Sequence, residues 1–283
     1  MKLITWNIQW GRGIDGRVDL ARIVSHARAM ADFDVLNLQE IADNFPALEG
    51  NDDADQFAQI ADLLPGYTAI PGYGVDHDGP GRRRRFGNMI VTRLPVIAVH
   101  RHALPWPADA GRESMPRVAI EATLRLPMGP VRVTTTHLEY YSALQRAAQA
   151  RRLRELHDEA CGRAAQPGFP THEGGPFDFT AQTASAILMA DFNFPPENPA
   201  YDDIQGPLAS GGPAYRDAWT VVNGHRAHQP TFCLHDHRYA KEPYCCDFVF
   251  VSEDLAKRVR EVRVDLDTQL SDHQPVLLDL DAR

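Results

Sequence analysis

Side chains that could bind a metal ion or a phosphate group follow four short apolar runs of this sequence. In chain order, the runs lead to Asn7, to Gln39-Glu40, to His137 and to Asp191-Phe192-Asn193. Apolar runs of four to six residues are typical of buried strands, so we expect these polar side chains to meet at one rim of a sheet. Carboxylate and amide oxygens suit a hard divalent cation such as Mg²⁺, with Mn²⁺ as an alternative. The pattern therefore predicts metal-dependent chemistry on phosphoesters.

The last part of the sequence adds two motifs with ionisable side chains. A fifth apolar run carries its acid, Asp247, at the first position, and the chain closes shortly after Ser271-Asp272-His273. Taken alone, each fragment is typical of an ordinary surface turn. Taken together, and in one chain, they indicate a shared site.

Helices and loops that would position these motifs can be predicted from composition and spacing. Apolar residues at helical spacing predict helices at about 18–31, 55–64 and 142–165. In the third helix, the expected inner positions are Leu144, Ala148, Leu153, Leu156 and Ala160. Stretches rich in Gly, Pro and charge predict an exposed loop at 73–85 and a surface loop at 166–181, for which we considered a lid function.

Strands account for the remaining apolar runs. We expect two strands at 86–92 and 96–100, hinged at Leu94-Pro95, and an antiparallel pair at 118–126 and 131–137. Four more are expected near residues 187, 247, 260 and 276. Many strands with only a few helices indicate packed, largely antiparallel sheets flanked by helices.

Composition limits the classes of protein that fit. The 283 residues are 43% hydrophobic without a shift that would mark a linker, so a single domain spanning 1–283 is expected. A net charge of -9 lacks the basic footprint of a strong non-specific nucleic-acid binder. Four irregularly spaced cysteines favour reduced thiols in a cytoplasmic protein. No signal peptide or membrane span is expected, and we expect a monomer.

The ordered set of motifs resembles the endonuclease/exonuclease/phosphatase superfamily over nearly the whole chain. The motifs that carry the resemblance are Trp6-Asn7, Leu38-Gln39-Glu40, Gly87 to Arg93, Thr136-His137-Leu138, Ala190 to Asn193, Asp247 to Ser252 and Ser271-Asp272-His273. The resemblance implies a DNase I-like α/β fold, a four-layered sandwich in which two mostly antiparallel sheets pack together between helices.

The same resemblance implies roles for individual residues. The metal would be held by Glu40, with Asp272 as a second carboxylate and Asn7 as support. Asp191 would activate the attacking water, while Asn193, His137 and His273 would contact the phosphate and Asp247 would hydrogen-bond the ring of His273. Substrate contacts are expected from Arg117, Thr231 and Tyr140, although an exposed strand arginine or a packed tyrosine would explain two of these equally simply.

The substrate stays open at this stage. The acidic balance slightly favours a phosphodiesterase or phosphatase acting on a small molecule or lipid headgroup. The alternative is a DNA endonuclease, abasic-site enzyme or exonuclease of the same superfamily. Many nuclease-type relatives have an arginine just before the acid that matches Asp247, whereas this chain has Cys245-Cys246. Two non-enzymatic alternatives are a catalytically inactive module and a zinc-stabilised binding module built on the His- and Cys-rich residues 225–246.

Overall fold

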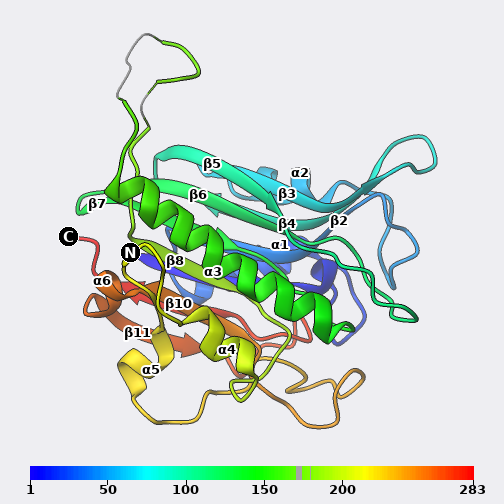
Figure 1. Cartoon of the computed structure of the whole chain (residues 1–283). Helices are drawn as coiled ribbons and strands as arrows, with labels where there is room; N and C mark the ends of the chain where they lie inside the picture. Colours follow the sequence, from blue (N-terminus) through cyan, green and yellow to red (C-terminus); the bar gives the residue numbers. More distant parts are fainter. Residues whose placement is uncertain (170–173, 179) are drawn as a thin grey trace.

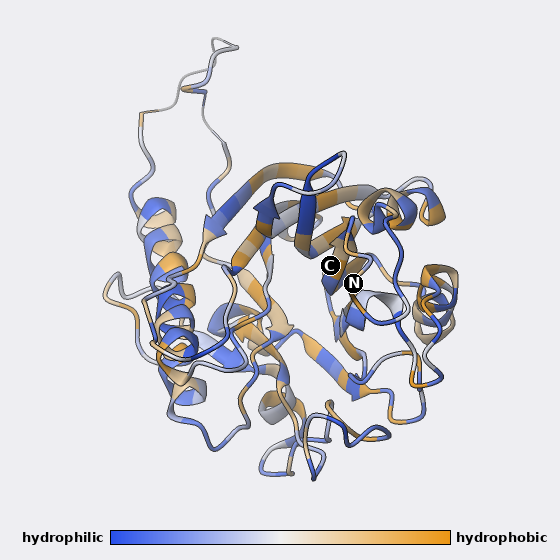
Figure 2. Cartoon of the chain, turned by 90° about the vertical axis from the view of Figure 1, so that its right-hand side faces the viewer, coloured by the Kyte–Doolittle hydropathy of each residue, from blue (hydrophilic) through white to orange (hydrophobic). Residues whose placement is uncertain are grey.

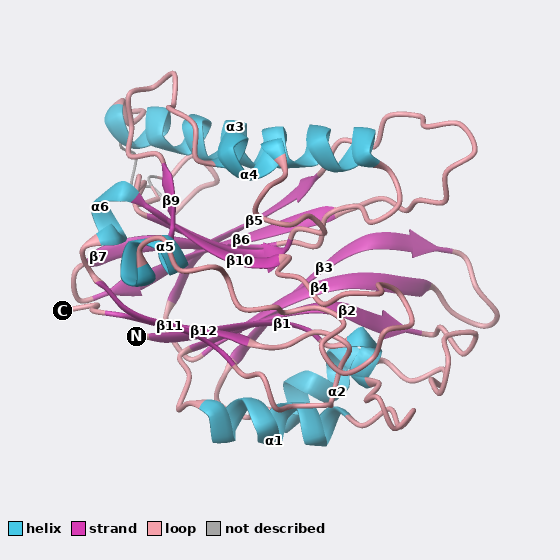
Figure 3. Cartoon of the chain, turned by 90° about the horizontal axis from the view of Figure 1, so that it is seen from below, coloured by secondary structure: helices cyan, strands magenta, loops and turns pink. Residues whose placement is uncertain are grey.

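The computed structural model describes residues 1–169, 174–178 and 180–283. Two six-stranded sheets pack face to face, and helices cover both outer faces, so that the molecule has four layers (Figure 3). This arrangement confirms the expected sandwich. Part of the predicted loop 166–181, residues 170–173 and 179, lies outside the described residues, and its expected lid function is not addressed by the structure.

The first sheet contains both chain ends of the fold. Its strands, in spatial order, are β11 (Val259–Val264), β12 (Val276–Leu280), β1 (Lys2–Asn7), β2 (Val35–Asp43), β4 (Arg84–Thr92) and β3 (Thr68–His77). Helices α1 (Leu20–Met30) and α2 (Gln56–Leu63) lie on its outer face (Figure 3). The short 3₁₀ turn η1 (Gln9–Gly11) follows β1 directly.

The second sheet has the order β5 (Val96–Ala103), β6 (Val118–Leu126), β7 (Gly129–Thr135), β8 (Ala186–Asp191), β10 (Asp247–Ser252) and β9 (Tyr215–Asp217). The long helix α3 (Ala143–Ala165) and α4 (Pro199–Ile204) cover its outer face, and α5 (Ala218–Asn223) and α6 (Glu253–Ala256) lie at one end (Figures 1 and 3). Most pairings are antiparallel, but β1 runs parallel to β2 and β7 runs parallel to β8. These two parallel pairs bring strand ends that carry polar motifs to the same edge.

Apolar side chains from both sheets form the central core. Leu3, Ile120, Val133 and Val249 are among its fully or almost fully buried members. Two further clusters pack the helices against the outer faces of the sheets. Figure 2 shows the hydrophobic residues concentrated on the strands and on the inward faces of the helices.

The predicted helices are present with almost the expected bounds because side chains cap their N-termini. The carboxylates of Asp19 and Asp55 and the hydroxyl of Ser142 each accept a backbone N–H from the first turn. One inner position in α3 was predicted wrongly, because Leu144 is 55% exposed. Gln145 and Gln149 face inward instead, since their amides hydrogen-bond to backbone oxygens of Pro107 and Pro105.

The prediction of a loop at 73–85 was also wrong. Residues 73–85 are not one exposed loop, because β3 extends to His77 and β4 begins at Arg84. The charges there are paired across the strands, with Arg85 opposite Asp76 in the ladder, so a charged sequence still forms a sheet. The two strands expected on either side of Leu94-Pro95 are present as β4 and β5, and this connection carries the chain from the first sheet to the second.

None of the helices in the described part of the chain combines the length and the apolar composition that crossing a membrane requires.

Candidate active site

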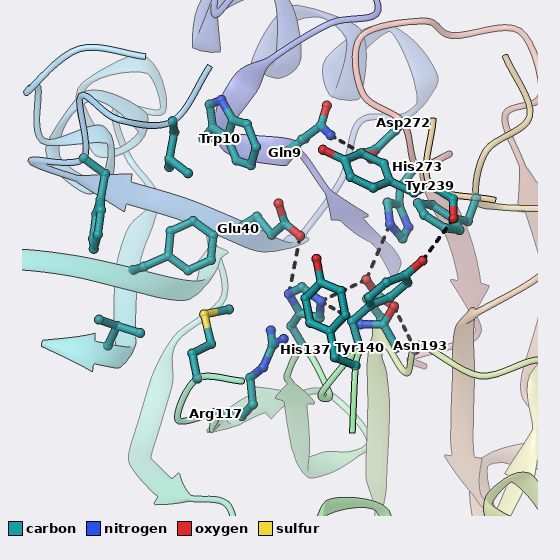
Figure 4. Close-up of a pocket in the computed structure, with 18 of the residues that line it drawn as sticks. Gln9, Trp10, Glu40, Arg117, His137, Tyr140, Asn193, Tyr239, Asp272 and His273 are labelled. Atoms are coloured by element: carbon teal, nitrogen blue, oxygen red, sulfur yellow. Dashed lines mark hydrogen bonds and ion pairs between the residues drawn. The ribbon is translucent and has the colours of Figure 1, made fainter. Parts of the chain in front are cut away.

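A pocket of about 460 Å³ lies at the edge where strand ends of the two sheets meet (Figure 4). Besides Gln9, its lining contains eight of the residues singled out from the sequence, namely Glu40, Arg117, His137, Tyr140, Asp191, Asn193, Asp272 and His273. The remaining lining residues are mostly aromatic or aliphatic. Side chains separated by more than 260 positions therefore converge on one cavity.

Glu40 owes its position to a β-bulge. The pairing of β2 with β4 shifts register between Leu38 and Ile41, and Glu40 has a φ of 59°. A bulge turns a side chain away from the regular alternation of a strand, and here it directs the carboxylate into the pocket. The side-chain amide of Asn7 donates a 3.1 Å hydrogen bond to Glu40 Oε1. Burial raises the pKa of Glu40 above its ordinary value.

Asp191 lies at the centre of the site and is fully buried. Its Oδ2 accepts a 3.0 Å hydrogen bond from Asn7 Nδ2 and lies 3.3 Å from His137 Nε2 and 3.6 Å from His273 Nε2. Burial, reinforced by the nearby charge of Asp247, raises the pKa of Asp191 to about 6 despite the opposing effect of His273. A carboxylate with such a pKa can exchange protons close to neutral pH.

Asn193 reaches the pocket from a turn and not from a strand. It lies beyond the end of β8, so it does not follow the alternation of that strand, and it has a φ of 53°. Its backbone N–H donates to Asp191 Oδ1 at 2.9 Å, and the turn returns its side chain to the site. The local Asx-type hydrogen bond, rather than the pleat of a strand, sets this geometry.

His137 presents a free ring nitrogen to the pocket. Its Nε2 accepts a hydrogen bond of 2.8 Å from the Asn193 amide, which favours the tautomer with a proton on Nδ1. Nδ1 is buried, has no hydrogen-bond partner, and lies 3.8 Å from Glu40 Oε1. Burial and the charges of Arg117 and His273 lower the pKa of His137 well below its ordinary value. The ring is therefore a neutral donor.

His273 has the opposite electrostatic character. Its Nδ1 lies 2.9 Å from Asp247 Oδ2, the pair expected from the resemblance. Burial opposes the charged ring, but the carboxylates of Asp247, Asp191 and Asp272 outweigh it and raise the pKa of His273 well above its ordinary value. The site thus places one neutral and one positively charged imidazole around Asp191.

Asp272 provides a third carboxylate of the pocket. Its Oδ2 accepts a 2.7 Å hydrogen bond from Gln9 Nε2. Burial, together with repulsion from Glu40, raises the pKa of Asp272 to about 6. Three carboxylates, the half-buried Glu40 and the buried Asp191 and Asp272, thus all have raised pKa values in one pocket. Such an oxygen-rich set fits a hard divalent cation, whose charge would relieve their mutual repulsion.

Two of the three predicted substrate contacts line the pocket. Arg117 is held by Glu139 at 3.2 Å, and its Nη1 is buried without a hydrogen-bond partner. Tyr140 forms part of the wall and donates its hydroxyl proton to the backbone oxygen of Tyr239. Thr231 is not among the lining residues. It is fully buried, and its hydroxyl oxygen accepts the backbone N–H groups of Cys246 and Asp247, so it fixes the start of β10.

The other sequence features have structural roles in the described residues. In the arginine run, Arg82 pairs with Asp43, and Arg83 pairs with Asp76. In the His- and Cys-rich segment, His228 pairs with Asp217 at 2.7 Å. Within the described part of the chain, the one cluster with metal-ligand spacing joins Cys246 to the active site, as Asp191, Cys246, Asp247 and His273. No separate zinc site is assembled there from residues 225–246.

Sequence reasoning missed the apolar half of the pocket. Its members, none of which was singled out, are Trp10, Phe45, Leu48, Val75, Phe86 and Met115. Trp10 lies three residues after the motif Trp6-Asn7, and Phe86 directly precedes the motif Gly87 to Arg93. The other four carry no chemical signature, so no sequence signal marked them.

A two-sheet sandwich with two imidazoles, those of His137 and His273, and a cluster of carboxylates at its edge is typical of a class of phosphoester-cleaving proteins. The model of the Endonuclease/Exonuclease/phosphatase family matches residues 4–273, and the chain belongs to this family. Its activity, at the level that the family defines, is the hydrolysis of phosphoester bonds. Among curated proteins, none matches the sequence.

Solved structures with the same fold span different activities. An endonuclease/exonuclease/phosphatase from Beutenbergia cavernae is 24% identical, with a TM-score of 0.66 and coverage of 100% of this chain and 71% of that one. A mannosyl-6-phosphatase from Bacteroides thetaiotaomicron is 20% identical, with a TM-score of 0.66 and 99% coverage of both chains. A 3'-5' exonuclease from Neisseria meningitidis is 20% identical, with a TM-score of 0.57, covering 99% of this chain and all of that one. At these identities the likeness supports the fold.

Proposed function

We propose that this protein is a divalent-metal-dependent phosphoester hydrolase in which a water molecule activated by Asp191 attacks phosphorus in line with the leaving oxygen. The observation that carries the proposal is the position of the Asp191 carboxylate. It lies within 3.6 Å of both catalytic imidazoles, and its pKa of about 6 suits a general base. A small-molecule or lipid-headgroup phosphoester is the favoured substrate.

In this proposal, Glu40 and Asp272 hold Mg²⁺ or Mn²⁺, and Asn7 positions Glu40 relative to Asp191. The supporting feature is the side-chain amide of Asn7, which donates to Glu40 at 3.1 Å and to Asp191 at 3.0 Å. A bound cation supplies charge neutralisation of the phosphate and stabilisation of the leaving oxygen.

The phosphoryl oxygens are bound by side chains with unused hydrogen-bonding capacity. His137 Nδ1 and Arg117 Nη1 are buried in the pocket region without partners, so they are available to donate to an incoming oxyanion. Charged His273, held by Asp247, stabilises the negative charge that develops at phosphorus. Asn193 orients His137 by donating to its Nε2.

Two features support the expected single domain and the expected cytoplasmic location. The contacts between the sheets form a continuous apolar core, which supports a single domain. All four cysteines are buried free thiols, in keeping with the cytoplasm as the proposed compartment.

The test is hydrolysis of a panel of phosphoesters by the purified protein with magnesium, manganese or a chelator. We expect release of phosphate or alcohol from a small phosphoester, abolished by the chelator and by Asp191→Ala. Cleavage of abasic or plasmid DNA without activity on any small ester would instead support the nuclease alternative. Near-normal activity of Asp191→Ala would contradict the proposed base.

A further inference from the structure

The active-site pocket has two chemically different halves. The polar half contains the carboxylates and imidazoles described above. The other half is formed by six half-buried apolar side chains, namely Trp10, Phe45, Leu48, Val75, Phe86 and Met115. Figure 4 shows Trp10 beside Gln9 and across the cavity from His137 and Tyr140. Apolar side chains that face a cavity rather than one another are a feature of ligand sites.

The apolar half is fixed by specific local structure. Trp10 has a φ of 45°, a rare conformation for a bulky residue, and its indole N–H donates to the backbone oxygen of Glu49 at 3.0 Å. Phe45 contacts Phe86 edge to face, with ring centroids 6.1 Å apart. A second bulge, between Tyr73 and Val75, shifts the pairing of β3 with β4 beside Phe86. These features hold the apolar side chains in place.

Four of the arginines near the apolar half are paired with carboxylates. Arg82 and Arg85 pair with Asp43, and Arg12 and Arg238 both pair with Glu49 at 2.8 and 2.7 Å. Among the residues that line the pocket, all of which the structure describes, Arg117 is the one arginine or lysine. A substrate chain with several phosphates would need more cations in this cavity.

We propose that this half of the pocket binds an aromatic ring or short hydrocarbon group of the alcohol portion of the substrate, so that the enzyme selects compact organic phosphoesters over hydrophilic ones. The inference rests on the proposed function, because the phosphate must occupy the polar half. A cavity of about 460 Å³ is large enough for a phosphate and one ring together.

The first experiment measures binding without turnover. Isothermal titration with magnesium compares 2-phenylethylphosphonate with ethylphosphonate, which share the anionic group and differ in the ring. We expect the phenyl compound to bind at least about tenfold tighter, since burial of apolar surface drives such differences. Equal affinities would overturn the inference, whether or not the protein shows any turnover.

The second experiment measures specificity with matched alcohols. Because 2-phenylethanol and ethanol are leaving groups of similar acidity, their phosphate monoesters and methyl diesters separate ring recognition from leaving-group chemistry. We expect kcat/KM to favour the phenylethyl esters by about tenfold or more, mainly through KM. In Phe45→Ala and Leu48→Ala this preference should fall towards unity, whereas ethyl esters should be little affected.

The control variant is Leu144→Ala, which removes an exposed leucine outside the pocket lining. It should keep the wild-type preference. Equal losses on both esters in the pocket variants would mean that these residues only maintain the fold, and would contradict the inference. Tight phosphonate binding without hydrolysis of any ester would support the apolar subsite while contradicting the proposed function.

Discussion

The imidazole of His273 and the carboxylate of Asp247 form a buried pair, with 2.9 Å between Nδ1 and Oδ2. This contact fixes the orientation of the charged ring and leaves Nε2 directed at Asp191. It also links the end of the chain to the first residue of β10, whose backbone is held by Thr231. Through Asp247, the position of the charged His273 ring therefore depends on the hydrogen bonds of Thr231 to the start of β10.

We expect Asp247→Asn to lower kcat by about 10²–10⁴-fold, the range seen when general acid–base or orienting groups are removed. The carboxylates raise the pKa of His273, so the loss of Asp247 should let the ring become neutral at a lower pH. The alkaline limb of the pH–rate profile should therefore move to lower pH. An unchanged profile would contradict a charged His273.

Asp191→Asn should lower kcat by at least about 10³-fold, since the amide cannot accept the proton of the attacking water. Thermal stability should be retained or slightly increased, because the substitution removes a buried carboxylate whose charge is opposed by burial. Asp202→Asn, at an exposed position of α4, is the matched control and should behave as wild type. Kinetics and melting curves measured side by side would check both expectations.

The stability of the metal-free protein should decrease as pH rises, because buried carboxylates lose their protons. The raised pKa values of about 6 for Asp191 and Asp272 mean that the metal-free folded protein takes up protons that the unfolded chain, with carboxyl pKa values near about 3.9, does not. Stability of the metal-free protein should therefore decrease as pH rises from about 4 through about 6.

A cation that replaces these protons should oppose that loss. The increase in melting temperature on adding magnesium to chelator-treated protein should be larger at pH 7.5 than at pH 5. Glu40→Gln should reduce the increase, whereas Glu155→Gln, on the exposed face of α3, should preserve it. A magnesium effect that is equal at both pH values would contradict the assigned carboxylates.

A third buried histidine, His157, should affect stability without affecting chemistry. His157 accepts from Arg132 at Nδ1, contacts Pro213 O through Nε2 and stacks on Tyr215. Burial and the charge of Arg132 lower the pKa of His157 to about 4. The unfolded chain therefore binds a proton more readily, and stability should decrease as pH falls from about 6.5 to about 4.

The loss attributable to His157 should be about 3 kcal/mol over this range, from about 1.4 kcal/mol per unit of pKa. Urea unfolding at several pH values would measure it. His157→Phe keeps the ring stack and removes the titrating group, so its stability curve should be flatter across this window. A curve as steep as that of wild type would show that other groups cause the acid sensitivity.

The sequence by itself determined most of the strands, the three principal helices and most of the residue types in the polar half of the site, but not β3 or β9. Short apolar runs ending in Glu40, His137 and Asp191 predicted both the sheets and the edge at which they meet, because a strand places its last residues at the rim. The family resemblance carried by the ordered motifs implied the pair of His273 with Asp247. The strands, the helices and the polar residues at the strand ends depend on local spacing and side-chain chemistry, which are present in the linear chain.

Only the tertiary structure decided how the site is shaped. The bulge that turns Glu40 inward, the left-handed turn at Asn193 and the place of Thr231 behind the pocket all depend on pairing with distant strands. The apolar half likewise combines residues from η1, β3, β4 and two loops. Register shifts and loop packing arise from contacts between segments far apart in the chain, so no local pattern encodes them.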